Sequence, residues 1–160
     1  MPVSNVTEID GVSREAIQVL TLGLAGEIFA IETERVYEVL DRVPITRIPN
    51  SRPFIKGLIN VRGKVISVTD LRVKFGMTPI VPTADTRIVV IEVRIEGEPT
   101  LVGALADKVY EVTELPGPQW KTHLGWHVLA AELIRAIGKR GDEFIIIADI
   151  DQVFASKMRP

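Results

Sequence analysis

Residues 47–76, RIPNSRPFIKGLINVRGKVISVTDLRVKFG, contain the local signals that decide the fold of this chain. Two apolar, β-branched runs stand on either side of Gly63-Lys64, which is typical of a β-hairpin. Asp70 has the side chain of a helix N-cap for residues 71–75, and Gly76 stands where a left-handed C-cap is expected. The stretch predicts a hairpin that leads into a short helix.

The same alternation of apolar runs and glycine turns continues outward from this stretch. A turn at 25–27 divides the runs 17–24 and 28–31, and a turn at 96–99 follows the run RIVVIEVRI. Closely spaced strands with glycine turns are typical of a small β-barrel or sandwich. With about nine or ten such strands, the chain has too many for one five-stranded barrel. We therefore expect a mainly β fold with short helical segments.

Three further segments bear on the organisation of the chain. Residues 32–38 predict a short helical stretch that leads into a strand at Val39-Leu40. The segment 127–139 is ambiguous, because its Ala, Leu and Glu favour a helix while the GKRGD turn and the run 144–150 favour a hairpin. The two prolines of the loop 76–86 make it the best internal boundary, and no sequence repeat or low-complexity segment is apparent.

Length and composition exclude several classes of protein. The 160 residues allow one domain, or two small lobes that share a core, and the 46% of hydrophobic residues is enough to bury that core. Nineteen basic residues nearly balance twenty-one acidic ones without any basic run, so we expect neither nucleic acid nor an anionic membrane as a partner. The absence of cysteine removes disulfides, thiolate nucleophiles and sulfur-ligated metals.

The N-terminal residues indicate the compartment. Residues 1–16 lack the basic and apolar regions of a secretory signal, and no stretch approaches the roughly 18 apolar residues of a membrane span. We therefore expect a cytoplasmic protein, with a flexible N-terminus over 1–15 and a C-terminal tail over 156–160.

The histidines and tryptophans offer only a weak case for a ligand site. His123 and His127 are four residues apart and could share a metal on a helix, but a third ligand is missing and Gly125 weakens the helix. Trp120 and Trp126 flank His123 without any basic cluster, which favours loop anchors packed on the fold over a stacking platform.

Residues 138–142 resemble ligand motifs only superficially. Gly138-Lys139 lacks the earlier glycine and the following Ser or Thr of a phosphate loop. Arg140-Gly141-Asp142 is explained by a turn between two strands, where glycine supplies a positive φ. No Ser/His/Asp arrangement is recognisable, so we predict a non-catalytic protein with no metal and no cofactor.

Residues 47–76 also resemble the signature segment of the CheW family. The elements that carry the resemblance, spaced as in that family, are Ile48-Pro49, Pro53-Phe54-Ile55-Lys56-Gly57, Asn60-Val61-Arg62-Gly63 and Asp70-Leu71-Arg72. Outside this stretch the fit extends to Phe29-Ala30-Ile31, Val36-Tyr37-Glu38-Val39, Val102-Gly103 and Ala106-Asp107-Lys108-Val109, so it covers residues 16–155. Val61 replaces the usual Leu, Ser67 stands where Pro is frequent, and residues 118–131 match poorly.

The resemblance implies a fold of two five-stranded, SH3-like β-barrels that share a hydrophobic core over residues 16–155, with a boundary near the 76–86 loop. It also resolves the ambiguous segment, because it implies that 132–137 is a strand paired with 143–149. The implied function is that of a chemotaxis signal-transduction adaptor. Such an adaptor couples the regulatory domain of a CheA-type histidine kinase to the cytoplasmic tips of methyl-accepting chemoreceptors, and is recruited to membrane-associated receptor arrays without direct membrane insertion.

Five residues are implied as the receptor-binding set. Val36, Glu38 and Arg62 come from the first barrel, and Val109 and Val112 from the second. Arg62 precedes a glycine turn, where its guanidinium would project outward to make bidentate bonds to a carboxylate, with Glu38 as its internal partner. The alternative interpretation is that Arg62 and Glu38 form an exposed ion pair that contributes little free energy. In that interpretation the valines are present because β-branched residues favour strands.

The other residues of the motif favour structural roles. A turn, cap or backbone requirement is expected at Gly57, Asn60, Gly63, Asp70 and Gly103. The kinase-facing residues are not identified.

Three alternatives remain open. The chain could serve a non-flagellar pathway of the same kind (twitching, biofilm or second-messenger). It could be a piece of a CheA kinase or of a CheV-like adaptor, against which its length, its start at Met1 and the lack of an acidic receiver pocket argue. It could also be a small-molecule-binding β-barrel or an unrecognised hydrolase.

Overall fold

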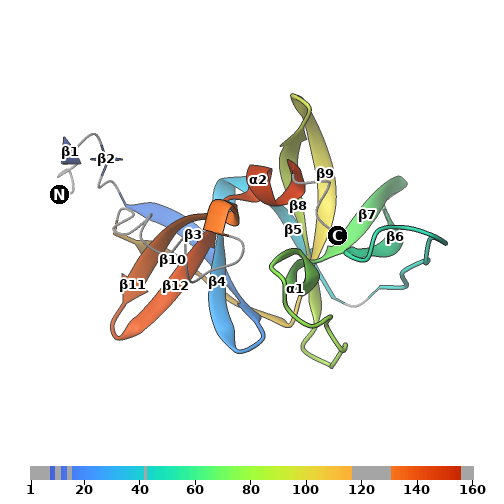
Figure 1. Cartoon of the computed structure of the whole chain (residues 1–160), viewed down its shortest axis with the longest axis horizontal. Helices are drawn as coiled ribbons and strands as arrows, with labels where there is room; N and C mark the ends of the chain where they lie inside the picture. Colours follow the sequence, from blue (N-terminus) through green and yellow to red (C-terminus); the bar gives the residue numbers. More distant parts are fainter. Residues whose placement is uncertain (1–7, 10–11, 14–15, 42, 117–130, 156–160) are drawn as a thin grey trace.

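The computed structural model describes residues 8–9, 12–13, 16–41, 43–116 and 131–155, most of which lie in two five-stranded sheets (Figure 1). This confirms the mainly β fold of two small barrels. We call the first the split barrel, because its strands come from two separate parts of the chain. In spatial order they are β10 (Lys108–Leu115), β3 (Ile17–Leu24), β4 (Glu27–Glu32), β12 (Glu143–Ala148) and β11 (Ile134–Arg140).

The second is the continuous barrel, because its strands all come from one stretch of chain between the two parts of the split barrel. In spatial order they are β5 (Val36–Leu40), β8 (Arg87–Ile95), β9 (Glu98–Ala106), β7 (Lys64–Asp70) and β6 (Ile55–Val61). A separate pair, β1 (Glu8–Ile9) and β2 (Val12–Ser13), forms a two-stranded antiparallel sheet of its own.

The two barrels have the same topology. In each, an edge strand pairs with the first strand of a hairpin, and the second strand of that hairpin runs parallel to a strand of another hairpin. The equivalent edge strands are β5 and β10, and the equivalent parallel pairs are β7·β9 and β12·β4. One strand of each parallel pair leads into a short helix: α1 (Leu71–Lys74) follows β7, and α2 (Ile150–Ala155) follows β12.

The chain passes between the barrels at two points. It leaves β4 through the 3₁₀ turn η1 (Thr33–Arg35) to enter β5, and it returns through Asp107 from β9 to β10. The loop 76–86 joins α1 to β8, both of which belong to the continuous barrel, so the chain does not cross between barrels where the prolines suggested. Prolines remove ladder donors and mark a loop, but they carry no information on which sheet the next strand joins.

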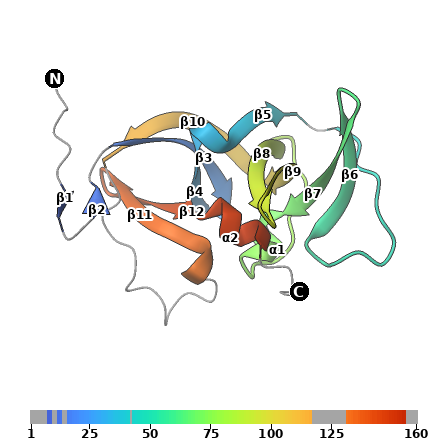
Figure 2. The ribbon, with the colours of Figure 1, turned by 90° about the horizontal axis from the view of Figure 1, so that it is seen from above.

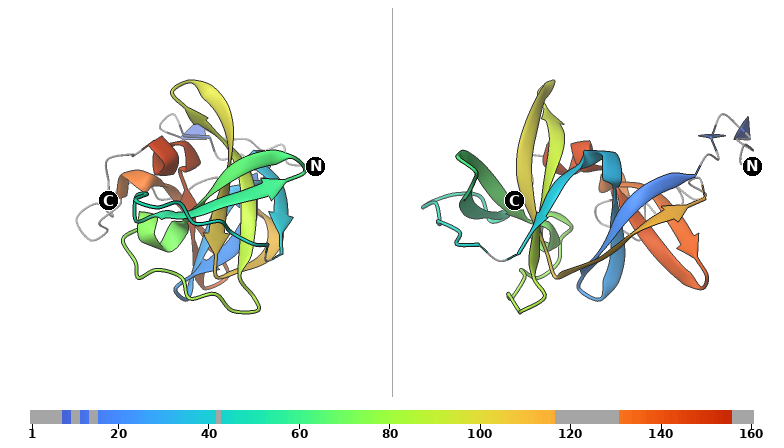
Figure 3. Two further views of the ribbon diagram at one scale, coloured as in Figure 1. Left: turned by 90° about the vertical axis from the view of Figure 1, so that its right-hand side faces the viewer. Right: turned by 180° about the vertical axis from the view of Figure 1, so that it is seen from behind.

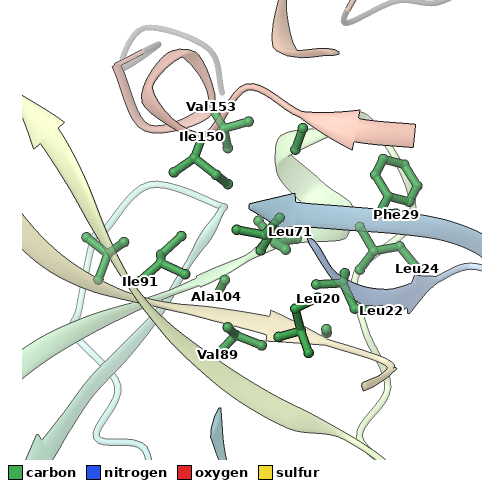
Figure 4. Close-up of a cluster of buried hydrophobic side chains, with 14 of the residues drawn as sticks. Leu20, Leu22, Leu24, Phe29, Leu71, Val89, Ile91, Ala104, Ile150 and Val153 are labelled. Atoms are coloured by element: carbon green, nitrogen blue, oxygen red, sulfur yellow. The ribbon is translucent and has the colours of Figure 1, made fainter. Parts of the chain in front are cut away.

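Both barrels contribute to one hydrophobic core (Figure 4). It contains Leu22 and Phe29 from the split barrel and Val89 and Ala104 from the continuous barrel, all nearly or fully buried. Leu71 of α1 and Val153 of α2 fill the remaining space from the two helices. Each barrel also has a smaller apolar cluster of its own, so the shared cluster is the largest of three among the described residues.

Several local predictions are confirmed. Residues 134–140 form a strand paired with β12, after a 3₁₀ turn η2 (Ala131–Leu133), rather than a helix. Asp70 caps α1 by accepting a hydrogen bond from the backbone N–H of Arg72, and Gly76 has the expected positive φ of +81°. Helix α2 was not expected: Asp149 accepts from the N–H of Gln152 and so begins this helix where we expected only the end of a strand.

Candidate functional site

The most unusual backbone of the candidate set is at Arg62. Arg62 and Gly63 are the two central residues of the β6–β7 hairpin, and both have positive φ, +50° and +88°. A two-residue hairpin turn of this kind favours Asn or Gly at its first position, and arginine is uncommon there. Asn60 supports the turn, because its side-chain oxygen accepts a hydrogen bond of 2.9 Å from the N–H of Gly63. The turn therefore holds the guanidinium out from the end of the barrel.

Arg62 and Glu38 form an ion pair that we call the first clasp. Nη2 and Nη1 of Arg62 donate to the two carboxylate oxygens of Glu38, the second at 3.4 Å. Because β5 and β6 are the two edges of the continuous barrel, the first clasp bridges the two edge strands. The Arg62 side chain is 68% exposed and that of Glu38 only 22%. The hydrogen bonds and charge of Glu38, with a smaller contribution from Tyr37, raise the pKa of Arg62 above its usual range.

The three valines of the set occupy different environments. Val36 at the start of β5 and Val109 near the start of β10 are partly buried against the shared core. Val112 is exposed on β10, together with Tyr110, and Tyr37 and Val39 are exposed on β5. Figure 2 and the right panel of Figure 3 show β5 and β10 on the same side of the molecule, diverging from the junction between the barrels.

We call this side of the molecule the β5–β10 face. The structure brings all five residues of the set to its two strands or to the adjoining β6–β7 turn: Val36 and Glu38 on β5, Arg62 in the turn, and Val109 and Val112 on β10. Exposed tyrosine and valine side chains next to an outward guanidinium combine an apolar surface with a charged rim, as protein interfaces do. The face is suited to docking another protein.

The residues expected to be structural have geometry that explains them. A Cβ on Gly57, whose φ is +150°, would stand 2.2 Å from the carbonyl oxygen of Thr46, which pairs with Leu58 beside it. A Cβ on Gly103 would meet Ile88 at 3.0 Å. Asp70 is fully buried, and besides capping α1 it accepts a hydrogen bond from the N–H of Ile80.

Two ion pairs that sequence reasoning missed lie where the chain crosses between barrels. We call them the crossing-point pairs. Arg72 of α1 binds the carboxylate of Asp107 through Nε and Nη2, and Asp107 also accepts from the N–H of Ala25, in the β3–β4 turn. Arg35 in η1 binds Asp151 of α2, which in turn accepts from the N–H of Arg94 on β8. Each pair joins both barrels and so fixes their relative position. Arg72 and Asp107 both stand within the family motif, but nothing in the sequence indicated that they pair.

An ion pair on the split barrel was also missed, and we call it the second clasp. Arg140, at the end of β11, donates to Glu111 of β10 at 2.9 Å and to Glu143 of β12 at 3.3 Å. Because β10 and β11 are the edges of the split barrel, the second clasp stands where the first clasp stands on the continuous barrel. Gly141 beside it has a φ of +62°, as expected of the turn at 140–142.

None of the remaining candidates forms a site among the residues that the structure describes. His123, His127, Trp120 and Trp126 lie outside the described residues. Within the part of the chain that the structure describes, no three His, Asp or Glu side chains are grouped as metal ligands. Gly138-Lys139 lies inside strand β11 and not in a loop before a helix. No helix among the described residues is long and apolar enough to cross a membrane.

Comparison with known proteins identifies the family to which this chain is similar. A family model described as the CheW-like domain matches residues 18–158. The chain is 31% identical to the chemotaxis protein CheW of Klebsiella aerogenes over 139 residues, which is 86% of this chain and 81% of that protein. It is 28% identical to a probable chemotaxis protein CheW of Rhizobium etli, over 86% of this chain and 87% of the relative.

A solved structure is similar in both sequence and fold. The crystal structure of the scaffolding protein TtCheW from Thermoanaerobacter tengcongensis superimposes with a TM-score of 0.75 at 30% identity, and the match covers 89% of this chain and 95% of that one. The family model spans nearly the whole chain, and the fold of the chain is shared with the similar structure. This chain belongs to the CheW-like domain family.

Proposed function

We propose that this protein is a chemotaxis adaptor that couples a CheA-type histidine kinase to the cytoplasmic tips of methyl-accepting chemoreceptors. Its relatives are named chemotaxis proteins, and one solved relative is named a scaffolding protein. The observation that carries the proposal is the Arg62 guanidinium, which a left-handed turn projects from the β5–β10 face and Glu38 holds in place.

In this function the β5–β10 face is the receptor-binding surface. A receptor tip is a hairpin of helices, and a helix can lay its apolar side along the exposed Tyr37, Val39, Tyr110 and Val112. The Arg62 side chain is exposed and that of Glu38 is mostly buried. The Arg62 guanidinium can therefore bind a receptor carboxylate while it keeps its bonds to Glu38. The protein contributes positioned contacts, and no chemical step is assigned to it.

The kinase binds elsewhere on the molecule in this proposal, and we assign no residues to that contact. Its regulatory domain is the proposed kinase partner. The adaptor acts in the cytoplasm and reaches the membrane only through the receptor arrays that it joins.

The proposal is tested by titrating the purified chain with a soluble fragment that contains the cytoplasmic hairpin of a chemoreceptor and, separately, with the kinase regulatory domain. Both should bind the wild-type chain. Arg62→Ala should weaken receptor binding by about tenfold or more while leaving kinase binding unchanged, because the loss of an exposed charged anchor acts on one interface.

Arg94→Ala is the matched control, because Arg94 is an exposed arginine whose side chain donates only to its own β8–β9 hairpin, at the carbonyl of Gly97. It should bind both partners as the wild-type chain does. A wild-type chain that binds neither fragment, or an Arg62→Ala variant with full receptor affinity, contradicts the proposal.

A further inference from the structure

The β5–β10 face is built from a repeated sequence. Residues 36–39 and 109–112 both read VYEV, and they occupy the equivalent edge strands of the two barrels. Both strands have a β-bulge within this tetrapeptide, between Val36 and Glu38 and between Val109 and Val112. The tyrosines of the two copies are exposed almost equally, 52% and 51%. The VYEV repeat in the sequence is therefore also a structural repeat on one surface.

The equivalence extends beyond the edge strands. Asp70 and Asp149 cap the two helices, so the strands before them can be aligned on these residues. Two residues before each cap, Val68 pairs in parallel with Gly103, and Ile147 pairs in parallel with Ala30. Counting back five residues gives Val65 and Phe144, which are both exposed, at 67% and 60%. The face is thus made of two similar halves, with Val36 and Val109 packed against the shared core and one clasp in each half.

A face with two similar halves poses a problem of direction. An elongated partner that fits across it in one direction fits nearly as well after it is turned end for end, because it meets the same apolar residues in the same order. A single binding direction requires a difference between the halves that favours one arrangement and penalises the other.

The two clasps supply such a difference, because their polarity is reversed. In the first clasp the arginine is outside and the acid is covered, 68% against 22% exposed. In the second clasp Arg140 is only 33% exposed, while its partners Glu111 and Glu143 are 59% and 54% exposed. The first clasp therefore presents an N–H donor with positive charge to a partner, and the second presents carboxylate oxygens with negative charge.

The hairpin turns beside the clasps add to this contrast. The turn of the first clasp is Arg62-Gly63-Lys64, which places a second base beside the arginine. The turn of the second clasp is Arg140-Gly141-Asp142-Glu143, which places one further acid, Asp142, beside Glu143. The first end thus has one acid and two bases, and the second has three acids and one base.

We propose that the opposite charges of the two clasps set the direction in which the receptor helix lies on the β5–β10 face. This inference rests on the proposed function, since it names the chemistry of the partner at that same surface. The partner helix carries a carboxylate where it meets Arg62, and a lysine or arginine where it meets Glu111 and Glu143. Turned end for end, the helix would bring like charges together at both clasps, and such contacts are strongly unfavourable at an interface.

The direction can be measured directly because the chain has no cysteine. Val39→Cys and Val112→Cys each place one thiol at the same position of the two VYEV copies, on exposed side chains. Each variant is mixed with receptor hairpin fragments that carry single cysteines along the helix, and disulfide cross-links are mapped under mild oxidation. The two thiols should cross-link to different ends of the helix.

A second variant removes the polarity but keeps the shape. Glu111→Gln with Glu143→Gln retains the acceptors for Arg140, and should weaken binding of the receptor hairpin by about tenfold at low salt, with a smaller effect at high salt. In that background the cross-links from the two thiols should become partly interchangeable. Glu98→Gln, an exposed acid of the β8–β9 hairpin, is the control and should change neither the affinity nor the cross-link map.

The outcomes separate the two proposals. If the wild-type chain binds the hairpin but both thiols cross-link to the same helix positions, the direction proposal is wrong and the docking face stands. The direction proposal is equally wrong if the double glutamine variant binds as tightly as the wild-type chain. If no receptor hairpin binds at all, the proposed function and the direction proposal both fall.

Discussion

The split barrel and the continuous barrel have one topology but are assembled in different ways. The continuous barrel is a single stretch from Val36 to Ala106, whereas the split barrel takes β3 and β4 from before that stretch and β10 to β12 from after it. Its parallel pair joins Phe29 to Ile146 and so spans most of the chain. Long-range pairings of this kind are slow to form, because the chain between them must be ordered first. Two sheets of the same topology can therefore form at different stages of folding.

The largest difference in stability between the two barrels is expected for a substitution at Gly57 of the continuous barrel. Gly57→Ala would place a Cβ 2.2 Å from a backbone oxygen at a φ of +150°, which the Thr46·Leu58 bridge leaves no room to relax. We expect a loss of about 3 kcal/mol or more of unfolding free energy, or failure to fold. Gly141→Ala in the split barrel is the control, because its Cβ would meet open space and costs about 1 kcal/mol from the positive φ alone. Urea unfolding compares them, and equal losses would contradict the prediction.

The shared core provides the next largest effect. Leu22→Ala on β3 empties a fully buried site, and should cost about 3–5 kcal/mol. Because the same cluster contains Val89 and Ala104 of the continuous barrel, both barrels should unfold together in one transition. Hydrogen exchange on β7 and β9 reports on the continuous barrel, and hydrogen exchange on β3 and β4 reports on the split barrel. Survival of protected β7 and β9 amides after the split barrel has unfolded would show that the two cores are separable.

The crossing-point pairs should have an intermediate effect. Asp107→Asn leaves the shape but removes the charge that Arg72 binds, and the two side chains are only about a quarter exposed, 22% and 23%. We expect a loss of about 1–2 kcal/mol, reduced by partial solvent screening. Asp85→Asn, which removes the loose 3.9 Å pair with Lys108, is the matched control and should leave the urea midpoint nearly unchanged. Equal midpoints for the two variants would show that the Arg72 pair does not join the barrels.

The smallest effect on stability is expected at the clasps themselves. Arg62→Ala removes an exposed side chain, and surface ion pairs contribute little to unfolding free energy. Its thermal midpoint should match that of the wild-type chain within error, and Arg140→Gln should behave in the same way. A clear fall in the midpoint for Arg62→Ala would mean that the first clasp is needed to close the barrel and is not reserved for a partner.

Much of the fold could be predicted from local signals in the sequence. Glycine turns marked the hairpins, and Asp70 and Gly76 marked α1, because turns and caps depend on a few neighbouring residues. The crossing of the chain between barrels could not be predicted in this way, because sheet membership depends on pairings between distant strands. Helix α2 shows an intermediate case: Asp149 repeats the capping role of Asp70, but it follows a strong apolar run that favoured a strand.

The candidate site was predictable only in part. Arg62 and Glu38 stand out because a family motif surrounds them, and the structure places them in contact. Glu111 and Arg140 belong to no such motif, and a four-residue repeat is too short to stand out among 160 residues. It becomes evident only when β5 and β10 are recognised as equivalent edge strands. Exposure decided the charge that each clasp presents, and exposure is a property of the folded chain.

The division of the split barrel has a consequence during synthesis of the protein on the ribosome. The hairpin β3–β4 emerges early, with Leu22 and Phe29 among the residues that will be buried, but its parallel partner β12 is made only after the whole continuous barrel has emerged. Until then the apolar side of this hairpin has no permanent cover, and such exposed surfaces are where nascent chains aggregate or recruit chaperones. The arrested nascent chain should therefore remain sensitive to protease until residues 143–148 leave the exit tunnel, and become resistant in one step when they do.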